Sequence, residues 1–229
     1  MVDFHTHILP QIDDGSGSLE ESLHMLSMLR DQQVSTVLAT PHFDANKQSI
    51  DRFVQRRSEA YTELQGRMDD ALPQIRLGAE VLYYSGISRW DNLDALCIEG
   101  TRVLLLEMPL ARWTTLMVRE VQSLSNTRGI TVVLAHIERY LKLQSPGVIQ
   151  ELLDSGIYMQ VNASFFIERS TRRTALKMLR CNQIHLLGSD CHGVQNRPPA
   201  LNEARNVIVK KYGEEFFDHM VAFAHEFIS

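Results

Sequence analysis

Short apolar runs alternate with longer amphipathic segments from one end of the chain to the other. Seven runs are rich in Val, Ile and Leu without strict polar–apolar alternation, and they cover residues 2–5, 34–39, 75–79, 102–106, 130–135, 158–161 and 184–188. Such runs are typical of parallel strands that are buried on both faces. The pattern therefore predicts seven parallel β-strands, with an eighth either absent or not recognisable from the sequence.

The segments between these runs have the spacing and the terminal residues of α-helices. Ser18 opens a Ser-Leu-Glu-Glu capping box, after which Leu19, Leu23, Leu26 and Leu29 recur at helical spacing. Further helices are predicted over residues 49–68, 114–128, 145–155, 171–182, 199–212 and 214–228. Strands that alternate with helices along the whole chain predict an α/β fold with a parallel sheet. Right-handed crossovers allow that sheet to close into a barrel.

Length and composition narrow the class of protein. The chain has 229 residues, 44% of them hydrophobic, which suits one α/β barrel with a substantial core. Its formal net charge of −5 argues against nucleic acid as the main partner. No apolar run reaches the roughly 18 residues that a membrane helix needs, and the first residues do not resemble a secretory signal. Three cysteines at no paired spacing argue against a disulfide framework, so we expect one cytoplasmic domain over residues 1–229.

Side chains that bind metals stand at the end of nearly every predicted strand. The C-terminal ends of parallel strands meet at one end of a barrel, where barrel enzymes build their active sites. The metal-ligand candidates at those ends are His5, His7, Asp14, His42, Glu80, Glu107, His136, Asp190 and His192. Asp13 and Asn162 are polar residues that accompany them.

Each candidate taken alone has a simpler interpretation. Asp13-Asp14-Gly15 is more often a turn, Asp190 could cap a helix, and a single buried His or Glu could be a paired core residue. Buried charges are costly unless they are paired or bound to metal, and no fold needs so many on one rim. The set therefore predicts a metal centre.

The types of ligand limit the choice of metal. A mixture of imidazole and carboxylate suits Mn, Fe, Zn or Mg better than a structural zinc site closed by thiolates. So many candidate ligands are too many for one ion, so two or three ions that share a bridging carboxylate are expected. Clusters of this kind generate hydroxide from bound water near neutral pH and hold both the attacking and the leaving oxygen.

Two arginines lie in loops that leave strands carrying candidate ligands. Arg139 follows His136, and Arg197 lies five residues after His192. Either could form a surface salt bridge. A guanidinium beside a cationic cluster is better explained by bidentate recognition of a phosphate group.

Residues 191–197 also fit the Cys-x5-Arg pattern of cysteine-dependent phosphatases. Those enzymes surround the phosphate with backbone amides, whereas Pro198 and Pro199 here have no amide to offer. Cys191 also stands between two better metal ligands. We therefore expect that Cys191 is not the nucleophile.

Taken together, these motifs resemble the polymerase-and-histidinol-phosphatase (PHP) superfamily, and within it the bacterial capsule and exopolysaccharide type of protein-tyrosine phosphatase. The motifs are Asp-Phe-His-Thr-His-Ile-Leu-Pro, Ile-Asp-Asp-Gly, Thr-Pro-His, Gly-Ala-Glu-Val, Leu-Glu-Met-Pro, Ala-His-Ile-Glu-Arg-Tyr, Gln-Val-Asn-Ala-Ser, Gly-Ser-Asp-Cys-His and Asn-Arg-Pro-Pro. They extend over almost the whole chain. The one departure is at the C-terminal end, which has no Asn-Pro segment of the kind expected in that family.

The resemblance implies a single PHP phosphatase domain with a distorted (β/α)7 barrel and a three-metal site, commonly occupied by manganese. It implies that one metal is bound by His5, His7, Glu80 and Asp190, a second by Glu80, Glu107 and His136, and a third by Asp14, His42 and His192. It also implies that Arg139 and Arg197 face the phosphate. The implied substrate is a tyrosine-phosphorylated tail of an autokinase that controls polysaccharide export.

The sequence therefore predicts a metal-dependent protein-tyrosine phosphatase in which metal-bound hydroxide attacks phosphorus. Two alternatives remain open at this point. One is a small-molecule phosphomonoesterase of the same superfamily, such as a histidinol phosphatase. The other is a non-catalytic regulatory module, although a complete set of ligands disfavours it.

Overall fold

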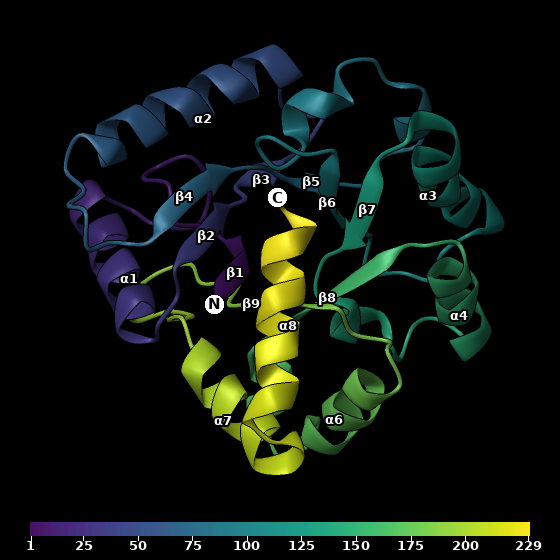
Figure 1. Ribbon diagram of the computed structural model, residues 1–229. Coiled ribbons are helices and arrows are strands. Elements are labelled where there is room, and N and C mark those ends of the chain that lie inside the picture. The colour runs from purple at the N-terminus through teal and green to yellow at the C-terminus, as the bar shows by residue number, and fades with distance from the viewer.

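Parallel strands form a ring in the middle of the molecule, and helices surround that ring (Figure 1). The computed structural model describes residues 1–229. Its strands are β1 (Val2–Thr6), β2 (Thr36–Ala39), β3 (His42–Phe43), β4 (Gln74–Leu77), β5 (Glu80–Leu82), β6 (Val103–Glu107), β7 (Thr131–Leu134), β8 (Tyr158–Asn162) and β9 (Leu186–Gly188).

The strand pairings close this ring with seven positions, because β2 and β3 together fill one position and β4 and β5 another; β3 and β5 lie beyond the ends of the predicted strands. β1 pairs with β2 and β2 with β4, while β3, β5, β6, β7, β8 and β9 pair in that order, all in parallel. β2 continues into β3, and β4 into β5, after two residues each. A parallel bridge between Thr6 and Cys191 joins the last strand to the first. The predicted barrel of seven parallel strands is confirmed, but the two breaks were not predicted.

Local chemistry accounts for both breaks. Pro41 stands in the first and has no amide to donate to a strand ladder. Gly78 stands in the second, where a Cβ would lie only 2.4 Å from Cδ1 of Ile98. Each break shifts the chain at the C-terminal end of the barrel, where His42 and Glu80 begin the second halves.

The predicted helices are all present, with ends that differ by no more than a few residues. They are α1 (Leu19–Asp31), α2 (Ile50–Gln65), α3 (Thr115–Arg128), α4 (Pro146–Asp154), α6 (Arg172–Arg180), α7 (Leu201–Tyr212) and α8 (Glu214–Phe227). The sequence did not predict the short helix α5 (Ser164–Ile167) or the 3-10 turns η1 (Ile87–Arg89), η2 (Leu93–Leu96) and η3 (Ile137–Tyr140). No helix is long and apolar enough to cross a bilayer.

The predicted capping box of α1 forms only in part. The Ser18 hydroxyl accepts a hydrogen bond from the amide of Glu21, as expected. The Glu21 carboxylate, however, accepts from the amides of Gly17 and Val194 instead of from that of Ser18. This glutamate therefore ties the start of α1 to the loop that follows β9.

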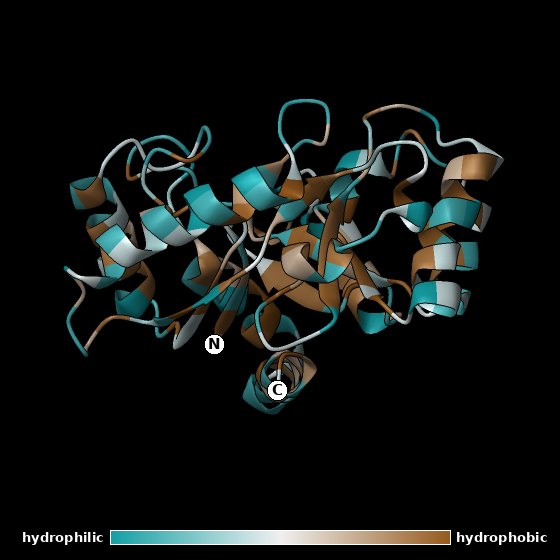
Figure 2. Ribbon diagram, turned by 90° about the horizontal axis from the view of Figure 1, so that it is seen from above, coloured by the Kyte–Doolittle hydropathy of each residue, from teal (hydrophilic) through white to brown (hydrophobic).

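Apolar side chains form two separate cores. The larger one packs the outer helices against the barrel, and Figure 2 shows mostly hydrophobic strands inside a shell of helices with hydrophilic outer faces. The smaller one includes Leu105 and Val133, which alternate with residues of the larger core and so point into the barrel. Ala224 and Ile228, in and just after α8, complete it, and α8 crosses the barrel in Figure 1. This helix closes the N-terminal end of the barrel.

Candidate metal centre

The nine predicted metal ligands lie together at the C-terminal end of the barrel, opposite α8. They come from β1, β3, β5 and β6 and from the loops that follow β1, β7 and β9. Their ligand atoms fall into four groups, each within 4.8 Å: His7, Asp14, His42 and His192; His5, His7 and Asp190; His5, Glu80 and His136; and His42, Glu80 and Glu107. Every one of the nine belongs to at least one group.

Two glycines permit this close approach. A Cβ on Gly15 would lie 2.2 Å from the carbonyl oxygen of His7, so only glycine lets the loop after β1 fold back onto the end of the strand. A Cβ on Gly188 would lie 2.7 Å from both His5 Cβ and Gln160 Nε2. A bulkier residue at position 15 would displace His7, and one at position 188 would displace His5.

Hydrogen bonds orient three of the imidazoles in the same way. His7 Nδ1 lies 2.8 Å from the Asp13 carboxylate, and His5 Nδ1 lies 3.3 Å from the side-chain oxygen of Gln160. His192 Nδ1 lies 2.9 Å from the backbone carbonyl two residues earlier. Each of these partners is an acceptor, so each ring donates its Nδ1 proton and keeps a lone pair on Nε2. These Nε2 atoms are the ones that face the centre.

The centre thus brings acceptors against acceptors. His5 Nε2 lies 3.1 Å from His7 Nε2 and 3.1 Å from Glu80 Oε2, with all three residues almost fully buried. His192 Nε2 has no hydrogen-bond partner, and Glu80 Oε2 faces the imidazole nitrogens of His5, His7 and His42 at 2.9 to 3.3 Å. Lone pairs that face one another in a buried site repel unless a cation lies between them. Ligands about 2.1 Å from a shared ion stand roughly 3 Å apart, and these separations fit that arrangement.

Glu80 lies where a bridging ligand would be needed. One of its oxygens is 2.7 Å from His136 Nε2, and the other is 2.9 Å from His42 Nδ1. Glu107 Oε1 lies 3.6 Å from the same atom of His136. A single buried carboxylate with imidazoles on both oxygens can hold two ions at once.

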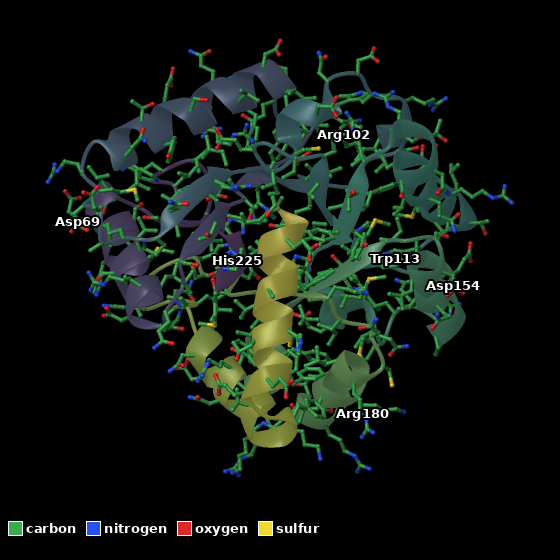
Figure 3. The ribbon with its side chains drawn as sticks, viewed as in Figure 1. Asp69, Arg102, Trp113, Asp154, Arg180 and His225 are labelled. Carbon is green, nitrogen blue, oxygen red and sulfur yellow. The ribbon has the colours of Figure 1, made fainter.

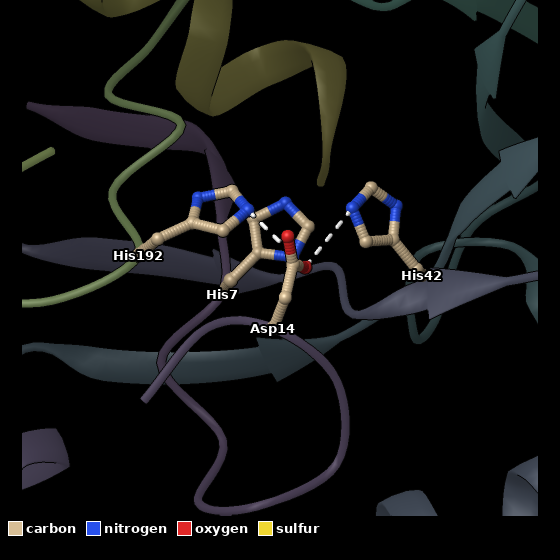
Figure 4. A group of neighbouring side chains, drawn as sticks. All are labelled: His7, Asp14, His42 and His192. Atoms are coloured by element: carbon tan, nitrogen blue, oxygen red, sulfur yellow. Dashed lines mark ion pairs between the residues drawn. The ribbon is translucent and has the colours of Figure 1, made fainter. Parts of the chain in front are cut away.

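The third group lies nearer to solvent. Figure 4 shows Asp14 between His42 and His192, at 3.3 and 3.5 Å from their Nε2 atoms. The Asp14 side chain is 65% exposed, whereas His192 is buried. Burial is the main cause that lowers the pKa of His192, to about 4. The imidazole is therefore neutral at neutral pH, and its Nε2 lone pair is available to a metal ion.

The neighbours of these ligands are charged in a way that supports them. Burial alone would raise the pKa of Asp13, but hydrogen bonds from His7 and from the amides of His42 and Gly15 lower it to about 2. Asp13 is therefore ionised and holds the His7 ring from behind. Burial would also raise the pKa of Asp190, yet its contacts with His5 and His7 keep that pKa well below the usual range.

Backbone strain also concentrates at this end of the barrel. His136, Asp190 and Arg197 have φ angles of 35°, 52° and 55°. Residues other than glycine adopt these left-handed conformations at a free-energy cost, usually where function requires a particular side-chain direction. All three belong to the predicted site.

Both predicted phosphate-facing arginines reach this centre. Arg139 Nη2 hydrogen-bonds Oδ2 of Asp190, and Arg197 Nη1 lies 3.4 Å from the same oxygen. The two guanidinium groups remain partly exposed, and both line a cleft of ≈ 290 Å³ beside the ligands. Their free N–H groups can therefore bind an anion that enters from solvent.

Several supporting residues were missed by sequence reasoning. Gln160 accepts hydrogen bonds from His5 Nδ1 and from the amide of His136, and the Tyr140 hydroxyl lies 3.3 Å from His136 Nδ1. Gln160 had a signal, because it is a polar residue in an apolar strand and shares a face with Asn162. Asn162 itself donates to Asp190. The sequence around Tyr140 contains no signal that distinguishes it from an ordinary core aromatic residue.

The structure also argues against Cys191 as a nucleophile. Its side chain is fully buried, and burial raises the pKa of its thiol. A cysteine nucleophile must be ionised and accessible. This agrees with the expectation from the two prolines that follow Arg197.

Fold and site together define an α/β barrel protein with a histidine–carboxylate cluster suited to several metal ions. The family model for capsular polysaccharide synthesis proteins of the CpsB/CapC type matches residues 1–227. The chain therefore belongs to the CpsB/CapC family, which confirms the resemblance inferred from its motifs.

Named relatives are similar over nearly the whole chain. Tyrosine-protein phosphatase CpsB of Streptococcus pneumoniae is 32% identical over 232 residues, covering 93% of this chain and 91% of the relative. Tyrosine-protein phosphatase YwqE of Bacillus subtilis is 27% identical over 225 residues, covering 94% and 86%. A solved structure, described as one of YwqE and CpsB, metal-dependent tyrosine phosphatases, matches with a TM-score of 0.86 at 24% identity and covers 100% of this chain and 94% of that one. The shared fold is the predicted barrel.

Proposed function

We propose that this chain is a metal-dependent phosphatase that hydrolyses phosphotyrosine in a protein substrate. The observation that carries the proposal is the buried set of lone pairs around Glu80 with two arginines beside it. Membership of the CpsB/CapC family and the two relatives named tyrosine-protein phosphatases support the choice of substrate. We also propose that residues 1–229 form one domain.

We propose that the ligands hold two or three ions, and that these are manganese, as the family resemblance implies. His5, His7, Glu80 and Asp190 would hold one, Glu80, Glu107 and His136 a second, and Asp14, His42 and His192 a third. Iron, zinc and magnesium also accept imidazole and carboxylate ligands in differing proportions. Bound metal ions lower the pKa of water, so that hydroxide is available near neutral pH, and they neutralise charge on phosphoryl oxygens.

The residues of the chain would orient the phosphate. Arg139 and Arg197 approach Asp190 from the exposed side, so their remaining N–H groups can hold the phosphoryl oxygens that point away from the ligands. Asn162 donates to the same carboxylate and fixes its direction. The site thus prepares positive charge where negative charge builds up during phosphoryl transfer.

A second cleft has room for the leaving group. It measures ≈ 600 Å³ and opens beside Asp14, His42 and Glu107. Most of its wall is polar, and Ile12 and Leu82 add a small apolar part that suits an aromatic ring. A phenol has a pKa of about 10, far below that of an alkanol, so an aryl ester needs little help from a general acid.

The family assignment suggests the biological substrate. We propose that it is a tyrosine-phosphorylated protein tail in capsule synthesis, such as that of a bacterial autokinase. A kinase that uses ATP would make that phosphotyrosine in the cytoplasm, so we place the enzyme there. Neither nucleic acid nor membrane insertion has a part in this proposal.

The test compares two substrates on one metal-loaded preparation. We expect kcat/KM to be far higher for a phosphotyrosine peptide than for histidinol phosphate or a phosphoserine peptide, because a phenol leaves far more easily than an alkanol. A preference for histidinol phosphate would overturn the substrate but leave the metal chemistry intact. Hydrolysis of none of these esters would favour a non-catalytic module.

A further inference from the structure

A groove between α6 and α7 is lined almost entirely by positive charge. It has a volume of ≈ 450 Å³, and its eight lining residues are Arg169, Arg172, Arg173, Leu176, Lys177, Arg180, Lys211 and Tyr212. None of them is acidic. The Tyr212 hydroxyl donates to the carbonyl of Leu176, which holds the two helices together along the groove.

The six Arg and Lys side chains that line this groove are not paired with acidic groups of the protein. None of the six takes part in an ion pair, whereas six other cationic side chains do: Arg30, Lys47, Arg102, Arg139, Arg197 and Arg205. Arg172 alone is used structurally, since it donates to the carbonyls of Phe166 and Ile167 at the end of α5. Five cations therefore face solvent together in a chain whose net charge is −5.

Helix stability does not explain them either. Lys177 and Arg180 lie near the C-terminus of α6, where cations are favourable, but Arg173 lies in its first turn, where they are not. Arg173 and Lys177 are also four residues apart, a spacing at which like charges destabilise a helix. Figure 3 shows Arg180 pointing outward from α6. The arrangement is better explained by an anionic ligand than by folding.

The groove begins next to the active site. Glu168 and Thr171 line the cleft that contains Arg139 and Arg197, while Arg169 lines the basic groove. The two hollows therefore share the short segment 168–172. A bound polypeptide could therefore run from one hollow into the other along this segment.

We propose that this basic groove binds the acidic or phosphorylated segment next to the phosphotyrosine that is being hydrolysed. The inference rests on the proposed function and adds to it a means of choosing substrates. Carboxylates or further phosphotyrosines of the same chain would pair with Arg169, Arg173 and Lys177. The enzyme then prefers a phosphotyrosine that lies in a strongly negative segment over one in a neutral segment.

The test uses the metal-loaded full chain and the double variant Arg173→Ala/Lys177→Ala. Both side chains are exposed, and alanine favours the helix, so the variant should fold normally. The control variant Arg67→Ala/Arg119→Ala removes two exposed positive charges elsewhere. Three substrates are compared: an aryl phosphate, a neutral peptide with one phosphotyrosine, and an acidic peptide with three.

We expect the groove variant to raise KM for the acidic peptide about fivefold, as the loss of two exposed ion pairs would. Its kcat, and its rates on the other two substrates, should stay within about twofold of those of the unmodified enzyme. The difference in KM should shrink as salt screens the charges. The control variant should behave like the unmodified enzyme.

Three outcomes would overturn the proposal. One is that the groove variant and the control variant have the same KM for the acidic peptide. Another is binding of the unmodified protein, but not the groove variant, to phosphatidylserine vesicles without any kinetic difference, because the groove would then serve a membrane. The third is that the groove variant and the unmodified protein bind the acidic peptide with the same Kd, measured by fluorescence anisotropy. That last measurement needs no turnover, so it separates failure of the groove from failure of the proposed enzymatic activity.

Discussion

The two ends of the barrel are built from the same strands but have opposite chemistry. At one end, α8 covers an apolar interior in which Phe4 and Phe227 pack with their ring centroids 5.8 Å apart. At the other end, buried imidazoles crowd around the Glu80 carboxylate, and His192 Nε2 has no hydrogen-bond partner. Within β6, Leu105 belongs to the first end and Glu107 to the second, although they are two residues apart on one face.

This difference shows where each end obtains its stability. Burial of apolar side chains stabilises the α8 end, and nothing further needs to be added. The ligand end contains charges and lone pairs that would be costly on their own, together with strained backbone at His136 and Asp190. We infer that this end becomes stable when metal binds, so substitutions at the two ends should have separable effects.

The largest effect is expected from loss of a ligand. His136→Ala or Asp190→Ala should each lower kcat by at least ~100-fold, which corresponds to roughly 2.7 kcal/mol of barrier. Metal content per chain should fall in parallel. His219→Ala, which changes an exposed histidine on α8, is the matched control. Unchanged activity in either ligand variant would contradict the role of the cluster.

A substitution at the α8 end should lower the stability of the fold and leave the activity and the metal content unchanged. Val133→Ala removes two buried carbons from the inner core and should lower the free energy of unfolding by about 2 kcal/mol, measured by urea denaturation. The folded variant should keep its metal content and its kcat, because Val133 lies on the apolar side of β7. A loss of metal at temperatures where the variant is folded would show that the two ends are not independent.

The arginines should have a smaller effect on all substrates alike. Arg139→Ala and Arg197→Ala should each lower kcat/KM about tenfold for every phosphate ester, with metal content unchanged, because their proposed partner is the phosphoryl group. Arg139→Lys keeps the charge but loses the two-pronged donor, so it should recover only part of the activity. If either alanine variant lost metal, the role of that arginine would be to hold the Asp190 carboxylate in place and not to bind the phosphate.

Cys191→Ser should have the smallest effect. The change is nearly isosteric, and the thiol is buried and not ionised, so kcat should stay within about threefold. Complete loss of activity in a folded, metal-loaded variant, or a trapped phosphocysteine, would restore the thiol as the nucleophile.

Much of the fold was predictable because the signals are local. Strand runs, helix spacing and capping residues predicted seven barrel strands and every long helix. The breaks at Pro41 and Gly78 were not predicted, because a break depends on what packs against it, such as Ile98 against Gly78. The short turns beside the site were missed because they have too few residues for a periodic pattern.

The site was predictable for a different reason. Parallel strands bring their ends together, so residues far apart in sequence, such as His5 and Asp190, could be placed on one rim before the structure was known. Their assignment to particular ions remains a prediction. The orientation of each ring could not be predicted, because it depends on partners such as Gln160, which lies 155 residues from His5. The basic groove was also missed, since it forms only when α6 and α7 pack side by side.

The central claim is that metal ions held by this cluster are needed for hydrolysis, and metal removal tests it most directly. The protein would be treated with a strong chelator, dialysed, analysed for metal by mass spectrometry and assayed on an aryl phosphate. We expect activity to disappear with the metal and to return with Mn²⁺ far better than with Ca²⁺, which prefers more oxygen ligands. Full activity in protein shown to contain no metal would contradict the account.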